Sequence, residues 1–490
     1  MDPLWLVFAA YFAVLLLIGE VFARLKVRTL DDYLLSGREH GVAVTSLSLT
    51  ATVIGAGSTL GSAGVAYYVG VSAGWYLLSA GPGLVLLAYT LAPTLREMSL
   101  YTVPEYVGRR YGGWAAILAA VLGVLALALF VAAQFYAMGS LVAETTPLDL
   151  RPAIVAASLV VIAYTWRGGN WAIHWSDTFQ VILIVVGIGL VVAFALDRVG
   201  GLEAFRQPPP TAGFEEVGSR WFHPVTRRPV SGWAPFALGN TVLAWIVMST
   251  TWHFAMQSTA QRILSGRDVT VVRRSCLIAA ALTLPVGAMF ALSGMGARMI
   301  LPGLESPGAM QMLEQVRALP ALVEALLSPA LAGLVLASLV AIMMSTCDSA
   351  LLGSAALIVK DLSPRFRGDD AGERKETPEE EIRGSRRLVA IVGGGALVTA
   401  LLTPGLVQTL ELVAAVYGVA LFWPLILGRY WSGANEAGAI ASMVSSGLAG
   451  VGWRWGGLEE ATGIHMLNVA LPVAVIVLFA VSRISSRAEA

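Results

Sequence analysis

The sequence predicts an all-α polytopic membrane protein with about thirteen transmembrane helices. Of its 490 residues, 57% are hydrophobic and only 13% are charged, and the mean hydropathy is +0.73. A soluble chain of this length needs a much larger charged surface to stay in water. Apolar runs of about 20 residues, the length of helix that crosses a bilayer, recur along the whole chain.

Thirteen spans are expected along the chain. The first has no basic region before it and no small-residue cleavage site after it, so we expect a retained helix rather than a signal peptide. The spans lie near residues 4–23, 42–66, 72–93, 114–138, 152–166, 175–197, 233–258, 276–299, 321–352, 387–403, 408–428, 435–452 and 464–482.

The distribution of basic residues predicts the orientation in the plasma membrane. An odd number of spans places the termini on opposite sides. Most of the 32 Lys and Arg residues, Arg262 among them, fall on inner loops if the N-terminus is outside and the C-terminus inside. In this orientation the Pro-rich segment 200–232 is external, as a partly ordered loop or short helix. The mixed-charge segment 363–387 is internal, and we expect a solvated loop.

Several function classes lack support in the sequence. Basic and acidic residues both number 32, which gives no reason to expect nucleic acid or another polyanionic partner. Cys276 and Cys347 fall in separate spans, so we expect inert buried thiols rather than a disulfide or a metal cluster. No nucleophile–base pair or metal-ligand spacing suggests an enzyme, and without a P-loop domain any transport is expected to use an ion gradient.

A break is expected inside the second span. The stretch TATVIGAGSTLGSAG (50–64) places Gly, Ser and Thr at mid-membrane. Unwound backbone is tolerated there only where it lines a cavity or a site, and the carbonyls of Ala51 and Ile54 would then face a hard cation. Close helix packing through small residues explains the same composition equally well.

A second polar stretch, AIMMSTCDSALLGS (341–354), lies within the ninth span. Ser345 and Thr346 are adjacent hydroxyls, and Asp348 and Ser349 follow within one turn. An aspartate at this depth suggests a function with a cation or hydrogen-bond donors as its partner. Hydroxyls bonding back to their own helix explain the serines but not the acid.

Two further stretches combine polar and apolar residues. Asp177 in HWSDTFQ is either a cation ligand or an interfacial acid that caps the helix. In TWHFAMQ, Trp252, His253 and Gln257 lie within the seventh span. An aromatic belt explains the tryptophan but not the neighbouring histidine and glutamine.

These stretches resemble the motifs of the sodium/solute symporter family in identity and order. The matching pieces are DDYLLSGRE (31–39), TATVIGAGS (50–58), TVPEYVGRRYG (102–112), WSDTFQ (175–180), QRILSGRD (261–268), MSTCDSALL (344–352) and KDL (360–362). The resemblance implies two inverted five-helix repeats of LeuT type, in which helices 1 and 6 are broken. The corresponding division is 1–40 for an extra N-terminal helix and inner loop, 41–199 for the first repeat, 200–232 for the external loop, 233–428 for the second repeat with its inner loop 363–387, and 429–490 for two C-terminal helices.

The resemblance also implies roles for individual residues. The principal sodium site would use Ala51, Ile54, Ile342, Ser345 and Thr346. A second cation site, present in some members, would use Asp177 and Ser349, although those members have a serine where this chain has Asp348. The residues expected around the solute are Ser58, Trp252, His253 and Gln257.

The resulting prediction is a sodium-coupled secondary symporter that imports a small organic solute by alternating access. Sugar members have polar or acidic residues where this chain has Val53, Gly57 and Ser58, so a sugar is disfavoured, and an amino acid, a monocarboxylate or a quaternary amine remains open. One alternative is a proton-coupled transporter on the same fold, with Asp177 or Asp348 carrying the proton. Another is a membrane sensor that binds solute without moving it. The expected partners are sodium, the solute and the lipid bilayer, and the sequence indicates no oligomeric state.

Overall fold

The computed structural model describes the whole chain except residues 1–2, 207–238, 305–311, 364–376, 403–412 and 489–490. Within the described residues the secondary structure is helical, and no β-strand is present apart from an isolated backbone pairing of His40 with Gly266. The predicted all-α class is confirmed.

The first half of the chain contains α1 Pro3–Leu25, α2 Leu30–Leu35, α3 Val42–Val53, α4 Ser62–Val69, α5 Trp75–Leu78, α6 Ala80–Tyr89, α7 Leu91–Glu97, α8 Val103–Tyr111, α9 Gly113–Thr145, α10 Leu150–Val199 and α11 Leu202–Arg206. The second half contains α12 Gly239–Ala255, α13 Gln257–Ser265, α14 Val269–Ile300, α15 Met312–Leu326, α16 Pro329–Leu357, α18 Pro378–Leu402, α20 Ala420–Tyr430, α21 Glu436–Trp455, α22 Leu458–Thr462 and α23 Met466–Ala488.

Long apolar helices dominate this arrangement. In the described part of the chain, seven helical stretches are long and apolar enough to cross a membrane, and three shorter apolar helices accompany them. The observed helices follow the expected spans in order along the chain. The total of thirteen spans stays a prediction.

Two expected boundaries are corrected by the structure. The ninth span, 321–352, is two helices, because α15 ends at Leu326 and α16 begins at Pro329, where the fixed φ of proline suits a first helical turn. The expected inner loop 363–387 is helical from Pro378 onward, and its part 364–376 lies outside the described residues. The fifth and sixth expected spans are the two parts of α10, which are separated by a kink at Gly169 (φ 59°, ψ −164°), between the expected ranges.

The glycine at this interruption is required by both conformation and space. Its positive φ is unfavourable for residues with a side chain. A Cβ at Gly169 would also lie 2.5 Å from Cδ2 of Tyr33 on α2. The WSD motif therefore begins a new helical segment whose direction is set at Gly169.

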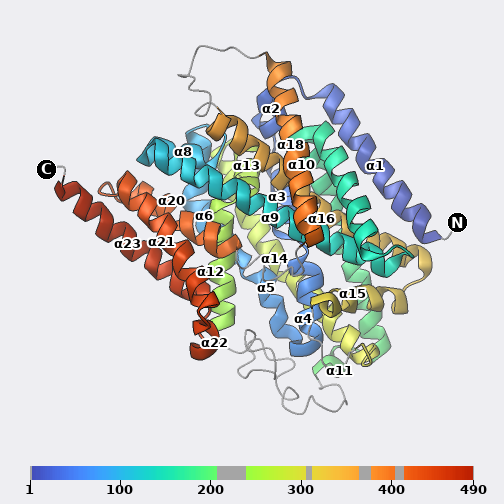
Figure 1. The fold of residues 1–490 in the computed structure, drawn as a ribbon. Coiled ribbons are helices and arrows are strands. Elements are labelled where there is room, and N and C mark those ends of the chain that lie inside the picture. The colour runs from blue at the N-terminus through green and yellow to red at the C-terminus, as the bar shows by residue number, and fades with distance from the viewer. Residues whose placement is uncertain (1–2, 207–238, 305–311, 364–376, 403–412, 489–490) are drawn as a thin grey trace.

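The centre of the molecule is α16. Its most apolar stretch is 83% buried, and it packs against α1, α9, α10 and α18. Helix α14 packs against α3, α4, α6 and α10, and α21 pairs with α23 at the C-terminal side (Figure 1). This packing brings α3, α13 and α16 into mutual contact, although they come from opposite halves of the chain.

Candidate functional site

The span that carries TATVIGAGS is broken at Ile54, as predicted. Helix α3 ends at Val53, and Ile54 has an extended backbone (φ −86°, ψ 106°). The chain becomes helical again at Ala56 and continues through a π-helical turn, Gly57–Gly61, into α4. The break leaves backbone groups of both half-helices without their usual partners.

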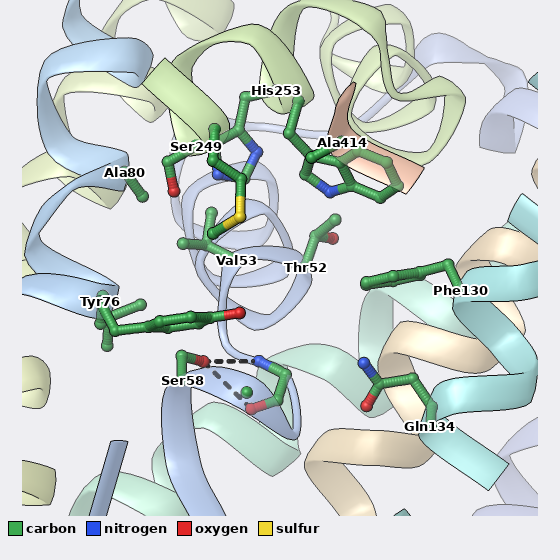
Figure 2. Close-up of a pocket in the computed structure, with 15 residues that line it drawn as sticks. Thr52, Val53, Ser58, Tyr76, Ala80, Phe130, Gln134, Ser249, His253 and Ala414 are labelled. Atoms are coloured by element: carbon green, nitrogen blue, oxygen red, sulfur yellow. Dashed lines mark hydrogen bonds between the residues drawn. The ribbon is translucent and has the colours of Figure 1, made fainter. Parts of the chain in front are cut away.

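Side chains take over the donors at this break. The Gly55 N–H donates to Ser58 Oγ at 2.8 Å (Figure 2), and the Ala56 N–H donates to Gln134 Oε1 on α9 at 3.1 Å. In an unbroken helix the Gly55 N–H would instead bond the carbonyl of Ala51. The Ala51 carbonyl is thereby released from its helical donor, which is the condition under which it can face a cation.

The hydroxyl pair on α16 lies directly against this break. Thr346 Oγ1 is 3.3 Å from the Ile54 carbonyl oxygen and 3.0 Å from that of Ile342. Ser345 Oγ donates to the same Ile342 carbonyl at 2.8 Å. Four of the five expected sodium ligands are therefore joined by hydrogen bonds, and buried Ala51 lies one turn before Ile54.

This oxygen set suits a hard monovalent cation. All five groups are neutral oxygens, three from carbonyls and two from hydroxyls. Divalent ions in proteins are usually held with carboxylates as well. Within the described residues, no group of three or more His, Cys, Asp or Glu side chains could hold a metal ion.

Asp177 and Ser349 also come together, but an arginine joins them. Arg262 Nη2 donates to Asp177 Oδ2 at 3.0 Å and to Ser349 Oγ. The side chains of Arg262 and Asp177 are both fully buried. Ser48 on α3 donates a further bond to Asp177 Oδ2 at 2.6 Å. The carboxylate expected to hold a second cation thus already has a positively charged partner.

The buried position of Arg262 corrects an expectation from the sequence. The orientation argument places it among the basic residues of an inner loop, whereas it lies on α13 with no exposed surface. Its Nη1 donates to Asn170 Oδ1 at 3.1 Å, and Asn170 Nδ2 in turn donates to Ser265 Oγ at 2.8 Å. Burial and the nearby charge of Arg262 lower the pKa of His40, in the loop before α3, to about 4, so that ring is neutral at neutral pH.

Asp348 adds a second buried acid to α16. Ser349 Oγ lies 3.0 Å from Asp348 Oδ1, and no partner of Oδ2 is found in the described part of the chain. Arg262 bonds Asp177 and not Asp348. The two acids therefore have different surroundings.

A cavity of about 70 Å³ lies beside the break. Three of the four residues expected around the solute, Ser58, Trp252 and His253, line it. In Figure 2, Ser249 and His253 face Ser58 and Gln134 across the cavity. The Trp252 ring lies 5.0 Å from that of Phe130, which forms part of the wall.

Gln257, the fourth expected residue, lies elsewhere. The break between α12 and α13 falls at Met256, whose backbone is extended (φ −69°, ψ 121°), and Gln257 begins α13 beyond it. Its Oε1 accepts the Val103 N–H at 3.0 Å, and its Nε2 donates to the Tyr101 carbonyl at 2.8 Å. The side chain thereby joins α13 to the first turn of α8 and does not line the cavity.

A comparison with family models identifies the chain. The model described as the sodium:solute symporter family matches residues 7–446. The chain belongs to the sodium:solute symporter family.

Individual relatives of this symporter are distant but extend over most of its length. It is 27% identical over 435 residues to the sodium/pantothenate symporter of Escherichia coli (strain K12), covering 86% of this chain and 83% of the relative. It is 24% identical over 483 residues to the sodium/glucose cotransporter 1 of Oryctolagus cuniculus, covering 91% and 70% respectively.

A solved structure of a Na⁺-coupled sialic acid symporter, in a substrate-bound outward-open state, superposes with a TM-score of 0.81 at 19% identity, covering 99% of this chain and 98% of that one. The five-plus-five inverted-repeat fold with two broken helices is thus shown, and family membership makes sodium the co-transported ion.

Gln134 and Tyr76 are residues of this symporter that the sequence interpretation did not select. Gln134 could have been found as the single amide within the apolar run 114–138. Tyr76 stands near the start of its span, where a tyrosine is ordinary, so nothing distinguished it. Its hydroxyl would lie 2.5 Å from a Cβ at Gly57, which explains why the wall of the cavity has a glycine there.

Proposed function

We propose that this symporter couples the entry of one sodium ion to that of a small organic solute carrying a single carboxylate, such as a monocarboxylate or an amino acid. The observation that carries the proposal is that one break serves both sites. Gly55 lines the solute cavity. Thr346 Oγ1 lies 3.7 Å from the point where a Cβ would stand if residue 55 had a side chain. Ala51, Ile54, Ile342, Ser345 and Thr346 are the proposed sodium ligands.

The cavity wall supports this solute class. The described lining residues include hydroxyls, an amide, a histidine and aromatic rings, but no Asp, Glu, Lys or Arg. A quaternary amine has a fixed positive charge and no N–H to donate to these oxygens, so it would lack a carboxylate or hydrogen-bonded partner among these residues. A carboxylate can instead approach sodium and the N-terminal end of the second half-helix, which begins at Ala56 and favours negative charge.

The apolar part of the solute is proposed to lie against Trp252 and Phe130. Ser58, Ser249 and Gln134 would then hydrogen-bond its polar atoms. A sugar, with hydroxyls around its whole ring, would need more polar partners than these walls offer. Among the relatives, pantothenate and sialic acid each carry one carboxylate, whereas glucose carries none.

Coupling follows from the shared break. Sodium at this position would hold the end of α3 against α16 and thereby fix the wall of the cavity. Each ligand then favours binding of the other, typically by about 1–3 kcal/mol. Release is proposed to require movement of α13 away from α8, because Gln257 joins these helices.

The proposed stoichiometry of one sodium rests on Arg262. Its guanidinium bonds both Asp177 and Ser349, so a second cation there would have to displace it or share the carboxylate with it. The cost of leaving a buried arginine without its partner opposes that exchange.

The orientation and the division into units are also proposals. We place the N-terminus outside, the C-terminus inside and the chain in the plasma membrane, with repeats at 41–199 and 233–428, an extra segment 1–40, an external loop 200–232 and a C-terminal pair of helices in 429–490. The distribution of basic residues supports this orientation.

The test is uptake into proteoliposomes that contain the purified full-length chain. An inward sodium gradient without a pH gradient should drive accumulation of a monocarboxylate or an amino acid, and neither glucose nor choline should compete. A pH gradient that drives uptake in the absence of sodium would favour the proton-coupled alternative. Solute binding without any uptake would favour the sensor.

A further inference from the structure

A second, larger cavity has no described lining residue on the broken helices and lies at the ends of three membrane helices. It measures about 880 Å³ and lies between the end of α1, the kinked region of α10 and the first turns of α18. Both α1 and α18 pack against α10 (Figure 1). We call it the basic pocket, because its wall includes Arg24, Arg28, Arg167, Arg383, Arg386 and Arg387.

The positive charge of the basic pocket is only partly neutralised. Glu20 pairs with both Arg24 and Arg167, at 2.5 Å and 2.6 Å. Among the described lining residues, Glu379 is the single acid. Six guanidinium groups therefore face two carboxylates, and the excess of positive charge favours an anionic ligand.

Several of these guanidinium groups are available to a ligand. Within the described part of the chain, neither Arg383 nor Arg387 has an ion-pair partner, and both are exposed. Arg386 is positioned by a bond from its Nη2 to the Arg167 carbonyl at 3.1 Å, and its guanidinium lies over the rings of Tyr33 and Trp166, at 5.8 Å and 5.9 Å. Arg386 Nε is buried without a hydrogen-bond partner among the described residues. Planar guanidinium groups arranged in this way match the oxygens of a phosphate.

The surroundings indicate that the anion belongs to an amphiphile. Large apolar side chains stand exposed beside the basic pocket, with Leu17 on α1 62% exposed and Ile391 on α18 68% exposed. On membrane helices such side chains face the hydrocarbon. Trp166, which lines the basic pocket and is 43% exposed, has the amphipathic ring that favours the headgroup level.

We propose that the basic pocket binds the phosphate headgroup of an anionic phospholipid of the cytoplasmic leaflet, whose acyl chains lie on the exposed apolar faces of α1 and α18. Basic pockets between membrane helices on the cytoplasmic side recognise such headgroups by the same chemistry. The leaflet follows from the proposed orientation, whereas the chemistry of the site does not depend on the solute. The bound lipid would link α1 to α18 across α10.

The test uses the full-length chain purified in detergent, with native mass spectrometry and thermal unfolding as readouts. Phosphatidylglycerol should bind and raise the melting temperature, and phosphatidylcholine should do neither. In the double variant, which carries both Arg383→Gln and Arg387→Gln, we expect the affinity for phosphatidylglycerol to fall at least tenfold. Arg274→Gln is the matched control, because Arg274 is exposed on α14 and does not line the basic pocket. This control should bind phosphatidylglycerol with the same affinity as the original chain.

Three results would overturn the proposal. The first is unchanged phosphatidylglycerol affinity in the double variant, and the second is an equal loss in Arg274→Gln, which would indicate a general surface effect. The third is equally strong binding of inorganic phosphate or glycerol phosphate, which would make this a site for soluble anions. Sodium-dependent stabilisation should persist in the double variant, so a misfolded variant is recognised by its loss, and Arg383→Gln alone then replaces it.

Discussion

Replacing Thr346 by valine removes one proposed sodium ligand and leaves the shape of the side chain nearly unchanged. The hydroxyl of Thr346 is the group that spans from α16 to the break, since it contacts the carbonyl of Ile54 as well as that of its own helix at Ile342. A methyl group in its place can neither bind a cation nor donate a hydrogen bond. We therefore expect a large effect on sodium and a small effect on folding.

The magnitude follows from the contacts that are lost. A hydrogen bond involving a charged group contributes about 1.5–3 kcal/mol, and we take the contact of a neutral oxygen with sodium to be similar. Since each 1.4 kcal/mol is tenfold in a dissociation constant, half-saturating sodium should rise by roughly 10- to 100-fold. Without sodium, the loss of a neutral hydrogen bond costs only about 1 kcal/mol of stability.

Sodium titrations of thermal unfolding and of solute uptake would measure this shift. Thr346→Ser keeps the hydroxyl and should stay close to the original affinity. Ser345→Ala should also raise half-saturating sodium, and both changes together should nearly abolish sodium-driven uptake. Ser62→Ala is the matched control, because Ser62 lies on the same broken span but bonds the Ala73 carbonyl at 3.0 Å.

The result that would refute the sodium site is a Thr346→Val chain with unchanged sodium affinity and uptake. In that case the small residues around the break serve only close helix packing. A drop in stability that is the same with and without sodium would lead to the same conclusion.

Four other predictions test the remaining assignments. Arg262→Gln leaves Asp177 buried without its cation, so we expect a loss of about 3–5 kcal/mol that the added change Asp177→Asn partly restores; stability equal to the original chain would contradict the buried pair. The Hill coefficient for sodium in the original chain should be close to one. A value near two would contradict this stoichiometry and support a second sodium site. Gln134→Leu removes the acceptor for the Ala56 N–H and should raise the KM for solute at least tenfold, whereas an unchanged KM would place the solute elsewhere. On a background without native cysteines, Glu460→Cys should react with an impermeant reagent in intact cells and Ser432→Cys should not; the reverse pattern would invert the orientation.

The parts of this fold that depend on local composition were predictable from the sequence. Apolar run length located the helices, and the Gly- and Ser-rich stretch located the break at Ile54, because hydrocarbon tolerates such residues in only a few arrangements. The division of 321–352 into α15 and α16 was missed, since Pro329 and the residues before it are apolar enough to continue a run. The helical start of α18 was missed for the opposite reason, because its charged first turns gave no apolar periodicity.

The candidate site was predictable only where a residue's role follows from its own chemistry. Ser345 and Thr346 belong to that group, since two adjacent hydroxyls on a membrane helix supply oxygen ligands wherever that helix meets a broken one. Gln257 and Arg262 do not, because their roles depend on which surface the segment after Met256 turns toward. Both lie on α13 within six residues. The resemblance implied a break in the seventh span but not the direction of the chain after it, and the sequence placed Gln257 in the cavity and Arg262 at the inner surface.

The break at Met256 changes this assignment. It turns α13 so that Gln257 bonds the backbone before α8 and Arg262 enters the space between α10 and α16. One turn of the backbone thus removes an amide from the solute site and places a permanent positive charge beside Asp177. A helix break redirects all the side chains that follow it, so site residues after a break can be assigned only once its geometry is known. Arg262 is such a residue, and the proposed sodium stoichiometry of this symporter depends on it.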